Sequence, residues 1–404
     1  MKILQVNCVY NNGSTGKIMY DIHRGIQENG MESIICYGRG LRVNEPNVYK
    51  TSSEILAKFN ALRARITGLQ YNGALFATNK LIKCIKRENP DIVHLHCING
   101  YFVNIYNLLN FLKRNNIKTV LTLHAEFMHT GSCGYAYECN KWMTGCGNCP
   151  QLRSATKSYL FDRTHSAWEK MRRGFEGFNN LQIVSVSHWL ENRAKKSPIM
   201  EAHNFKVIGN GIDTEQIFYP TQFQYLREKH RLNDEKLILF VTASFSLRED
   251  DVKGGRHIVD LAERLIKDNI KIIIIGSRDL TIAVPNNVIN VGRINNQKEL
   301  AAYYSMADLT VLTSERETFS MICAESLSCG TPIVGFKAGA PETIALPDFS
   351  DFVEYGDINS LEKLVRQWIT RKSELTVALA RMAGEFYSKE KMLKGYFDVY
   401  FREQ

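Results

Sequence analysis

Short apolar runs alternate with longer amphipathic stretches along the first half of the chain. The runs have the length of buried strands, whereas the stretches between them carry apolar residues at helical spacing. The pattern predicts strands at 3–6, 33–36, 92–95, 119–122 and 182–186 and helices at 16–29, 55–67, 75–88, 105–115 and 161–178. Because strand and helix follow each other in turn, we expect a doubly wound parallel α/β sheet.

The same alternation begins again near residue 236. The run 272–275 is an unbroken series of isoleucines, which is typical of a parallel strand whose two faces are both covered. This half predicts strands at 236–242, 271–276, 309–312 and 332–336, helices at 257–267, 298–306 and 318–329, and a mostly helical end at 361–403. The chain is therefore expected to form two α/β domains that share an architecture without a sequence repeat.

The composition argues against a fibrous, disordered or disulfide-dense secreted protein. The 404 residues are 44% hydrophobic and 23% charged, as in an ordinary globular protein, and no apolar run approaches the roughly 18–20 residues of a membrane-spanning helix. The first residues read as a strand and lack the build of a signal peptide, so we expect a cytoplasmic protein.

Charge is unevenly divided between the two halves. Residues 1–200 hold 26 Lys+Arg and 13 Asp+Glu, which gives +13, whereas residues 201–404 hold 25 and 29, which gives −4. A basic half can face anionic lipid headgroups, a phosphate-bearing substrate or nucleic acid, although a solvated lysine-rich surface explains it equally well. Nucleic acid is the weakest of these partners because the sequence has no interleaved aromatics and no recognised module.

The segment 314–334 carries the most specific signal. It leads from a strand into a helix, so free N–H donors suited to a diphosphate or a sugar hydroxyl are expected at Thr318, Phe319 and Ser320. Glu317 and Glu325 are eight residues apart, about two helical turns, and should project on one side. A carboxylate suits the paired hydroxyls of a ribose. Taken alone, two surface glutamates on an amphipathic helix are the ordinary alternative.

The whole string resembles the Glu-x7-Glu motif of the family-4 retaining glycosyltransferases. That resemblance implies the GT-B fold, in which two Rossmann-like domains face each other across a cleft. It also implies that Glu317 contacts the donor sugar and that Glu325 binds the nucleotide ribose. We expect an N-terminal acceptor-binding domain at 1–200, a nucleotide-sugar-binding domain at 201–385 and a C-terminal helix at 386–404 that returns to the first domain.

Two further segments of the second domain resemble the same family. The sequence around Asn210 is similar to its Asn-Gly-Ile-Asp loop, and Lys253 precedes a glycine as in its Lys-Gly pair, where the lysine neutralises the donor diphosphate. The family often has an upstream arginine after the first strand of this domain. Residues 242–245 contain none, so Arg248 is the candidate replacement in the donor site.

The glycine-rich turn after the first strand resembles the family's first loop. A nucleotide-binding P-loop is excluded because Asn11 and Ile18 stand where that motif needs Gly and Ser or Thr. The resemblance places Gly16 near the donor and Ser14 and Thr15 near the acceptor. A plain strand-to-helix turn is the alternative for the two hydroxyl side chains.

Two histidines end predicted strands, where side chains face the ligand edge of an open sheet. A single such histidine is more often a core residue. His124 matches the family's Thr-x-His, which implies a contact with the transferred sugar, and His96 is the weaker candidate, for the acceptor site.

The loop at 130–150 holds four cysteines, Cys133, Cys139, Cys146 and Cys149, with the spacing C-x5-C-x6-C-x2-C. Four thiolates can bind a structural zinc ion, and a reducing compartment favours zinc over two disulfides; reduced thiols are the third possibility. The loop resembles a subgroup that includes the colanic acid glycosyltransferases. That subgroup has an Asp after the histidine, whereas this chain has Ala125 followed by Glu126.

The resemblance implies a reaction. A hexose moves from a UDP- or GDP-sugar to a hydroxyl of a glycan, which we expect to be linked to undecaprenyl pyrophosphate, in bacterial O-antigen or capsule synthesis. The anomeric configuration is retained in a front-face reaction without a catalytic metal, and the residues implied to be catalytic are His124, Glu317 and Lys253. We expect peripheral contact with the inner face of the membrane, with one candidate basic patch at Lys80, Lys83, Lys86 and Arg87. The alternatives are a non-catalytic nucleotide-sugar binder or scaffold and a nucleotide-sugar epimerase.

Overall fold

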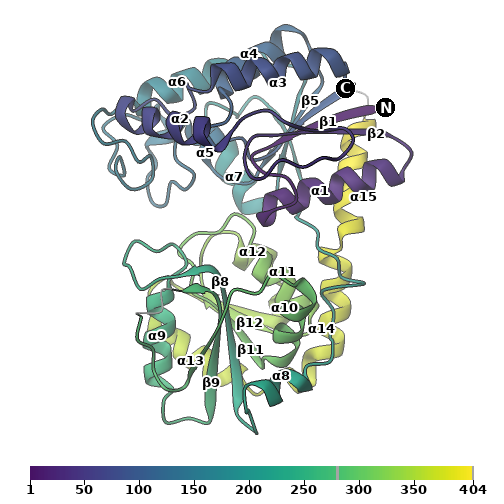
Figure 1. Cartoon of the computed structure of the whole chain (residues 1–404). Helices are drawn as coiled ribbons and strands as arrows, with labels where there is room; N and C mark the ends of the chain where they lie inside the picture. The colour runs from purple at the N-terminus through teal and green to yellow at the C-terminus, as the bar shows by residue number, and fades with distance from the viewer. Residues whose placement is uncertain (279–281, 403–404) are drawn as a thin grey trace. The chain divides into compact units, whose positions relative to one another are not determined.

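The computed structural model describes residues 1–278 and 282–402, which form two compact units. Unit 1 comprises residues 1–209 together with the chain from 393 onward, and unit 2 comprises residues 210–392. Each unit contains one parallel sheet with helices packed on both of its faces (Figure 1). The expected pair of Rossmann-like α/β domains is confirmed.

Unit 1 is built on a seven-stranded sheet with the order β3-β2-β1-β4-β5-β6-β7. The strand order reverses between β1 and β4, and such a switch point is where open α/β sheets bind ligands. The strands are β1 (Lys2–Asn7), β2 (Glu32–Tyr37), β3 (Val48–Lys50), β4 (Ile92–Leu95), β5 (Thr119–Leu123), β6 (Leu181–Ser185) and β7 (Asn204–Val207).

Amphipathic helices cover both faces of this sheet. In α4, for example, Ile105, Leu108, Leu109 and Leu112 are buried at the spacing of one helical face. The helices before residue 209 are α1 (Gly13–Glu28), α2 (Glu54–Thr67), α3 (Leu75–Glu88), α4 (Ile105–Arg114), α5 (Phe127–Thr130), α6 (Thr164–Phe175) and α7 (His188–Lys195), with a 3-10 turn η1 (Lys141–Met143).

Unit 2 is built on a six-stranded sheet with the order β10-β9-β8-β11-β12-β13. Its core joins Ile272 and Ile274 of β9 to Leu261 of α9 and Leu361 of α13, as the uninterrupted isoleucine run predicts. The strands are β8 (Lys236–Phe245), β9 (Ile270–Arg278), β10 (Val288–Gly292), β11 (Leu309–Leu312), β12 (Ile333–Phe336) and β13 (Ser350–Val353). The helices are α8 (Gln224–Lys229), α9 (Gly255–Arg264), α10 (Gln297–Met306), α11 (Met321–Ser328), α12 (Pro341–Ile344), α13 (Ile358–Trp368) and α14 (Lys372–Tyr387), with a 3-10 turn η2 (Pro347–Phe349).

The last helix, α15 (Lys389–Phe401), returns the chain to unit 1, as predicted. The Tyr400 hydroxyl lies 2.7 Å from His94 Nδ1, and the Tyr396 hydroxyl lies 3.1 Å from Thr122 Oγ1. All four side chains are buried, so these hydrogen bonds attach α15 to β4 and β5. In the described part of the chain, no helix has the length and apolar character that crossing a membrane requires.

Candidate functional site

Lys253 and Glu317 form the centre of the candidate site in unit 2. Lys253 lies between β8 and α9, and Glu317 lies between β11 and α11. Because β8 and β11 are parallel neighbours, both loops leave the same edge of the sheet. Lys253 Nζ lies 2.5 Å from Glu317 Oε1, so the fold joins two predicted residues that are 64 positions apart.

The backbone around Gly254 fixes this pair. Gly254 has φ +67°, and a Cβ there would lie 2.3 Å from the Thr313 carbonyl oxygen. The Thr313 hydroxyl donates to the carbonyls of Lys253 and Gly254, both at 3.0 Å. The Lys-Gly pair is thus held against the end of β11, and only glycine fits the second position.

Glu317 precedes α11 instead of lying on it. Its N–H donates to the Ala338 carbonyl at 2.9 Å and its carbonyl accepts from Ala340 N–H at 3.2 Å, so the residue is extended against the loop after β12. The helix begins at Met321, not at 318. The prediction that Glu317 and Glu325 lie two turns apart on one helix is therefore wrong.

The turn into α11 leaves backbone donors available. Ser320 is a non-glycine residue with φ +78°, a conformation that concentrates at functional sites. Within the described residues, the N–H groups of Phe319 and Ser320 donate no hydrogen bond, although both residues are buried. Thr318, Phe319 and Ser320 thus lie in the turn before the helix and not in its first turn as predicted.

Glu325 lies on α11 and is half-buried. Its Oε2 accepts a hydrogen bond from the Tyr304 hydroxyl of α10 at 2.9 Å. Burial, with the nearby Glu325 charge, raises the pKa of Tyr304 well above its usual range, so the phenol stays a donor. Tyr304 therefore holds the Glu325 carboxylate in position.

Two further predicted donor residues differ in their surroundings. Arg248 is exposed and pairs with Asp250, with Nε 2.8 Å from Oδ1, and its place in the donor site stays a prediction. Asn210, the first residue of unit 2, is buried, and its Oδ1 has no hydrogen-bond partner within the described residues. A buried acceptor without a partner is a natural contact for a ligand.

Three histidines cluster at the switch point of unit 1. His96 Nδ1 lies 3.4 Å from His124 Nε2, and His96 Nε2 lies 3.0 Å from Gln5 Oε1 of β1. Burial lowers the pKa of His124 to about 4, and burial with the adjacent histidines lowers that of His96 well below its usual range. Both rings are therefore neutral at pH 7 and suited to hydrogen bonding. His94 has a different role, because Tyr400 and Thr122 occupy its two nitrogens.

The glycine-rich turn of unit 1 opens α1, which starts at Gly13 instead of the predicted residue 16. A Cβ at Gly16 would lie 3.1 Å from Val9 Cγ2 and 3.3 Å from the Val9 carbonyl oxygen, so a larger residue there would crowd the turn. Ser14 is exposed and Thr15 is half-exposed. Their places in the donor and acceptor sites remain predictions.

Comparison with known proteins decides the family. The profile described as Glycosyltransferase Family 4 matches residues 15–216, which is half of the chain, and the profile Glycosyl transferases group 1 matches residues 222–385. The chain belongs to glycosyltransferase family 4. It is thus a glycosyltransferase with the GT-B fold.

Relatives of this glycosyltransferase extend over its full length. It is 24% identical to the putative colanic acid biosynthesis glycosyl transferase WcaC of Escherichia coli, covering 99% of both chains. The structure of WaaG, a glycosyltransferase involved in lipopolysaccharide biosynthesis, matches with a TM-score of 0.68 at 14% identity, covering 100% of both. Anabaena Alr3699/HepE in complex with UDP-glucose matches with a TM-score of 0.64 at 14% identity, covering 99% of both.

The cysteine-rich loop of this glycosyltransferase is fixed by Glu126, whose role the sequence did not reveal. Its carboxylate is fully buried, accepts from Ala136 N–H at 2.7 Å and lies 2.5 Å from Arg193 Nε of α7. The Arg193 guanidinium also lies over the ring of the buried Trp142. Glu126 therefore anchors the loop through Ala136 and Arg193.

The four loop cysteines are free thiols, so no disulfide joins any two of them. Burial raises the pKa of Cys133 and of Cys146 to about 12. Across residues 1–278 and 282–402, no three His, Cys, Asp or Glu side chains gather so as to hold a metal ion. The structural zinc ion remains a prediction, to be tested by the zinc content of the purified protein.

The buried histidines should make the protein sensitive to acid. His124 has a folded pKa of about 4 against 6.5 when unfolded, so below pH 6.5 the unfolded chain binds the extra proton. The part of the unfolding free energy that depends on a neutral His124 is fully present above pH 6.5. It decreases by about 3 kcal/mol as the pH falls to 4. We expect His124→Gln to reduce the loss of unfolding free energy between pH 7 and 5 in urea titrations. The same change at the exposed His188 should leave the profile unaltered, and equal profiles for all three proteins would contradict the assignment.

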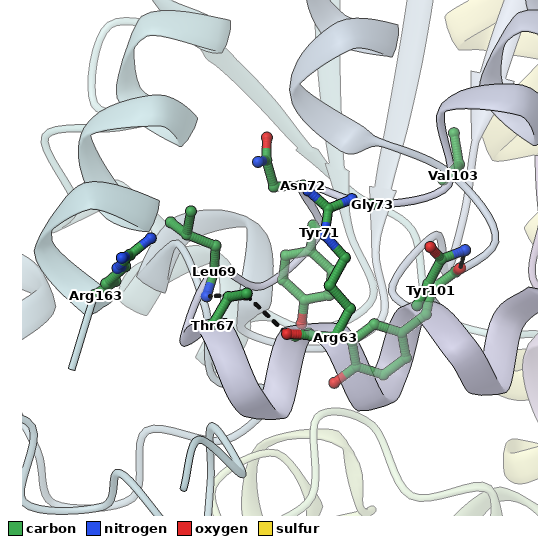
Figure 2. Close-up of a pocket in the computed structure, with 11 residues that line it drawn as sticks. Arg63, Thr67, Leu69, Tyr71, Asn72, Gly73, Tyr101, Val103 and Arg163 are labelled. Atoms are coloured by element: carbon green, nitrogen blue, oxygen red, sulfur yellow. Dashed lines mark hydrogen bonds between the residues drawn. The ribbon is translucent and has the colours of Figure 1, made fainter. Parts of the chain in front are cut away.

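A pocket of about 110 Å³ lies beside α2 and was not predicted (Figure 2). Tyr71 and Tyr101 line it with stacked rings whose centroids are 6.1 Å apart. Arg63 and Arg163 also line it, and Figure 2 shows Arg163 apart from the two tyrosines, beyond Leu69. Neither guanidinium forms an ion pair with a described residue.

Proposed function

We propose that the protein transfers a hexose from a UDP- or GDP-sugar to a hydroxyl of a lipid-linked glycan, with retention at the anomeric carbon, in surface polysaccharide synthesis. The observation that carries this proposal is the contact between Lys253 and Glu317. WcaC is described in colanic acid biosynthesis and WaaG in lipopolysaccharide biosynthesis, which supports a surface glycan as the acceptor. The complex of HepE with UDP-glucose supports a nucleotide sugar as the donor.

The donor is held by charge and by backbone donors. Lys253 neutralises the diphosphate, and the N–H groups of Phe319 and Ser320 supply hydrogen bonds that no described residue accepts. As the ammonium turns to the phosphates, the Glu317 carboxylate becomes available to accept from hydroxyls of the hexose. Glu325, held by Tyr304, accepts from the ribose hydroxyls. Asn210 and Arg248 complete the donor site in this proposal.

Transfer breaks the bond between the anomeric carbon and the phosphate oxygen and forms a bond from the acceptor oxygen on the same face. The acceptor's proton passes to the departing phosphate oxygen, so no side chain need act as a base. Lys253 and the two amides stabilise the charge that develops on that oxygen. The neutral His124 ring hydrogen-bonds the sugar, and His96, Ser14 and Thr15 contribute to the acceptor site on unit 1.

The test is a panel of UDP- and GDP-hexoses, followed by a turnover assay with a lipid-linked acceptor. We expect one nucleotide series to raise the unfolding temperature and its best member to be transferred with retained configuration. Binding without turnover would support a non-catalytic binder, and a free epimerised nucleotide sugar would support an epimerase. A panel in which no donor protects the protein would contradict the proposal.

A further inference from the structure

Exposed apolar side chains gather on one part of unit 1. Ten of the twenty large apolar side chains that are exposed in the described chain lie on α2, at the start of α3 and in the loop before α6. They are Ile55, Leu56, Phe59, Leu62, Ile66, Leu75, Phe76, Tyr159, Leu160 and Phe161. We call these ten residues the α2 surface. Such a concentration on one element marks an interaction site, whereas scattered exposed residues do not.

The helix α2 turns its large apolar residues outward. Its buried residues are Ala57, Asn60 and Ala64, which are small or polar. Phe59 and Leu62 are 63% and 53% exposed. The face of α2 that packs on the core therefore carries the small residues. The large exposed residues contribute little to the stability of unit 1.

Hydrogen bonds join the three parts of the α2 surface. Tyr159 N–H donates to the Arg65 carbonyl at 2.9 Å, which sets the loop of exposed residues 159–161 beside the end of α2. Asn60 Oδ1 accepts from Ala74 N–H at 3.0 Å, which ties the start of α3 to the same helix. Figure 1 shows α2 at one end of unit 1, beside the long connection between α5 and α6.

Basic residues predominate around the α2 surface. Helix α2 carries three cations, Lys58, Arg63 and Arg65, and its one carboxylate, Glu54, pairs with Arg39 outside the helix. Lys58, Arg63 and Arg65 form no ion pair with a described residue. Asp162, next to Phe161, accepts hydrogen bonds from Cys149 N–H and Thr164 N–H, so its charge is partly satisfied internally. An anionic partner is therefore complementary to this surface.

We propose that the α2 surface docks the protein on an anionic lipid bilayer. A helix with exposed aromatic and aliphatic residues flanked by Arg and Lys inserts its apolar face at the headgroup boundary, while the cations contact lipid phosphates. Arg63 also lines the pocket of Figure 2, so a headgroup phosphate beside α2 meets a guanidinium without a carboxylate partner. This surface replaces the predicted patch on α3 as the principal contact, because the α3 lysines lack an apolar neighbourhood of this extent.

Vesicle co-sedimentation of the full chain tests this docking, with phosphatidylcholine vesicles compared to vesicles containing about 30% phosphatidylglycerol. We expect binding to the anionic vesicles and weaker binding in high salt. Phe59→Ser with Leu62→Ser should lower the partition coefficient about tenfold or more, because both lose apolar area at the interface. Arg63→Gln with Arg65→Gln should have a comparable effect, since each cation near an anionic surface contributes about fivefold. Val377→Ser, which removes an 84% exposed residue of unit 2, is the matched apolar control.

Unchanged unfolding temperatures would show that the variants fold, and binding is measured without donor or acceptor, so the outcome is separate from the proposed reaction. Failure of the wild type to bind anionic vesicles, or equal binding by the Phe59→Ser, Leu62→Ser protein, would overturn the proposal. So would a wild-type dimer that this double variant converts to a monomer, because a second copy would then cover the surface.

Discussion

Replacement of Lys253 by alanine should lower kcat by about a hundredfold to a thousandfold, which is the effect of removing one charged or hydrogen-bonding group that stabilises a developing oxyanion. The ammonium contacts Glu317 and lies at the edge of the sheet where the donor phosphates are proposed to bind. The change removes a partly exposed side chain, so the chain should remain folded. Steady-state turnover with the donor found in the panel measures the effect.

The control for Lys253 is Lys229, which also pairs with a glutamate, Glu299, at 3.3 Å on the surface of unit 2. Lys229→Ala should leave turnover within about twofold, because an exposed pair of this kind contributes little. If both variants lose activity equally, the loss is a general effect of charge. If Lys253→Ala retains full turnover, the proposed charge stabilisation is wrong.

Replacement of Glu325 by alanine should weaken donor binding about tenfold to a hundredfold. Hydrogen bonds to a charged group contribute about 1.5–3 kcal/mol, and the two ribose hydroxyls would lose their acceptor. The Kd for the nucleotide diphosphate, measured by calorimetry, isolates this contact from the sugar. An unchanged Kd would show that the ribose binds elsewhere.

Tyr304→Phe tests how much the position of the Glu325 carboxylate matters, as distinct from its charge. It removes the hydrogen bond to Glu325 Oε2 and keeps the carboxylate, so the affinity should fall by less than in Glu325→Ala. The control for Glu325→Ala is Glu299→Ala, the same glutamate-to-alanine change on α10, which should leave the nucleotide Kd unaltered. A Tyr304→Phe effect larger than that of Glu325→Ala would contradict the assigned roles.

The central strands and long helices could be predicted because burial on one or both faces leaves a pattern in the sequence. The strand at Leu309–Leu312 and the helix at Leu75–Glu88 were predicted to the residue. The edge strands β3, β7, β10 and β13 were not predicted, because short and partly exposed strands have no regular alternation. The late start of α11 depends on the positive φ of Ser320, which its residue type does not favour.

Parts of the candidate site could not be predicted from local sequence patterns. The resemblance identified Lys253 and Glu317, but their contact requires β8 and β11 to be neighbours, which is a property of the whole sheet. Glu126 and Arg193 are 67 residues apart and no spacing rule relates them. The α2 surface was missed because a helical period does not reveal which face is buried, and here the small residues face inward.

The attachment of Tyr400 to His94 has a consequence for how the protein is made. Unit 1 is formed by residues 1–209 together with the chain from 393 onward, whereas unit 2 is one continuous segment. During synthesis, unit 2 has all of its residues before unit 1 does, and the places of Tyr396 and Tyr400 against β4 and β5 stay empty until the ribosome has added α15. A stop codon just before Tyr396 would therefore damage the sheet of unit 1, which is distant in sequence, and spare unit 2, which is adjacent in sequence.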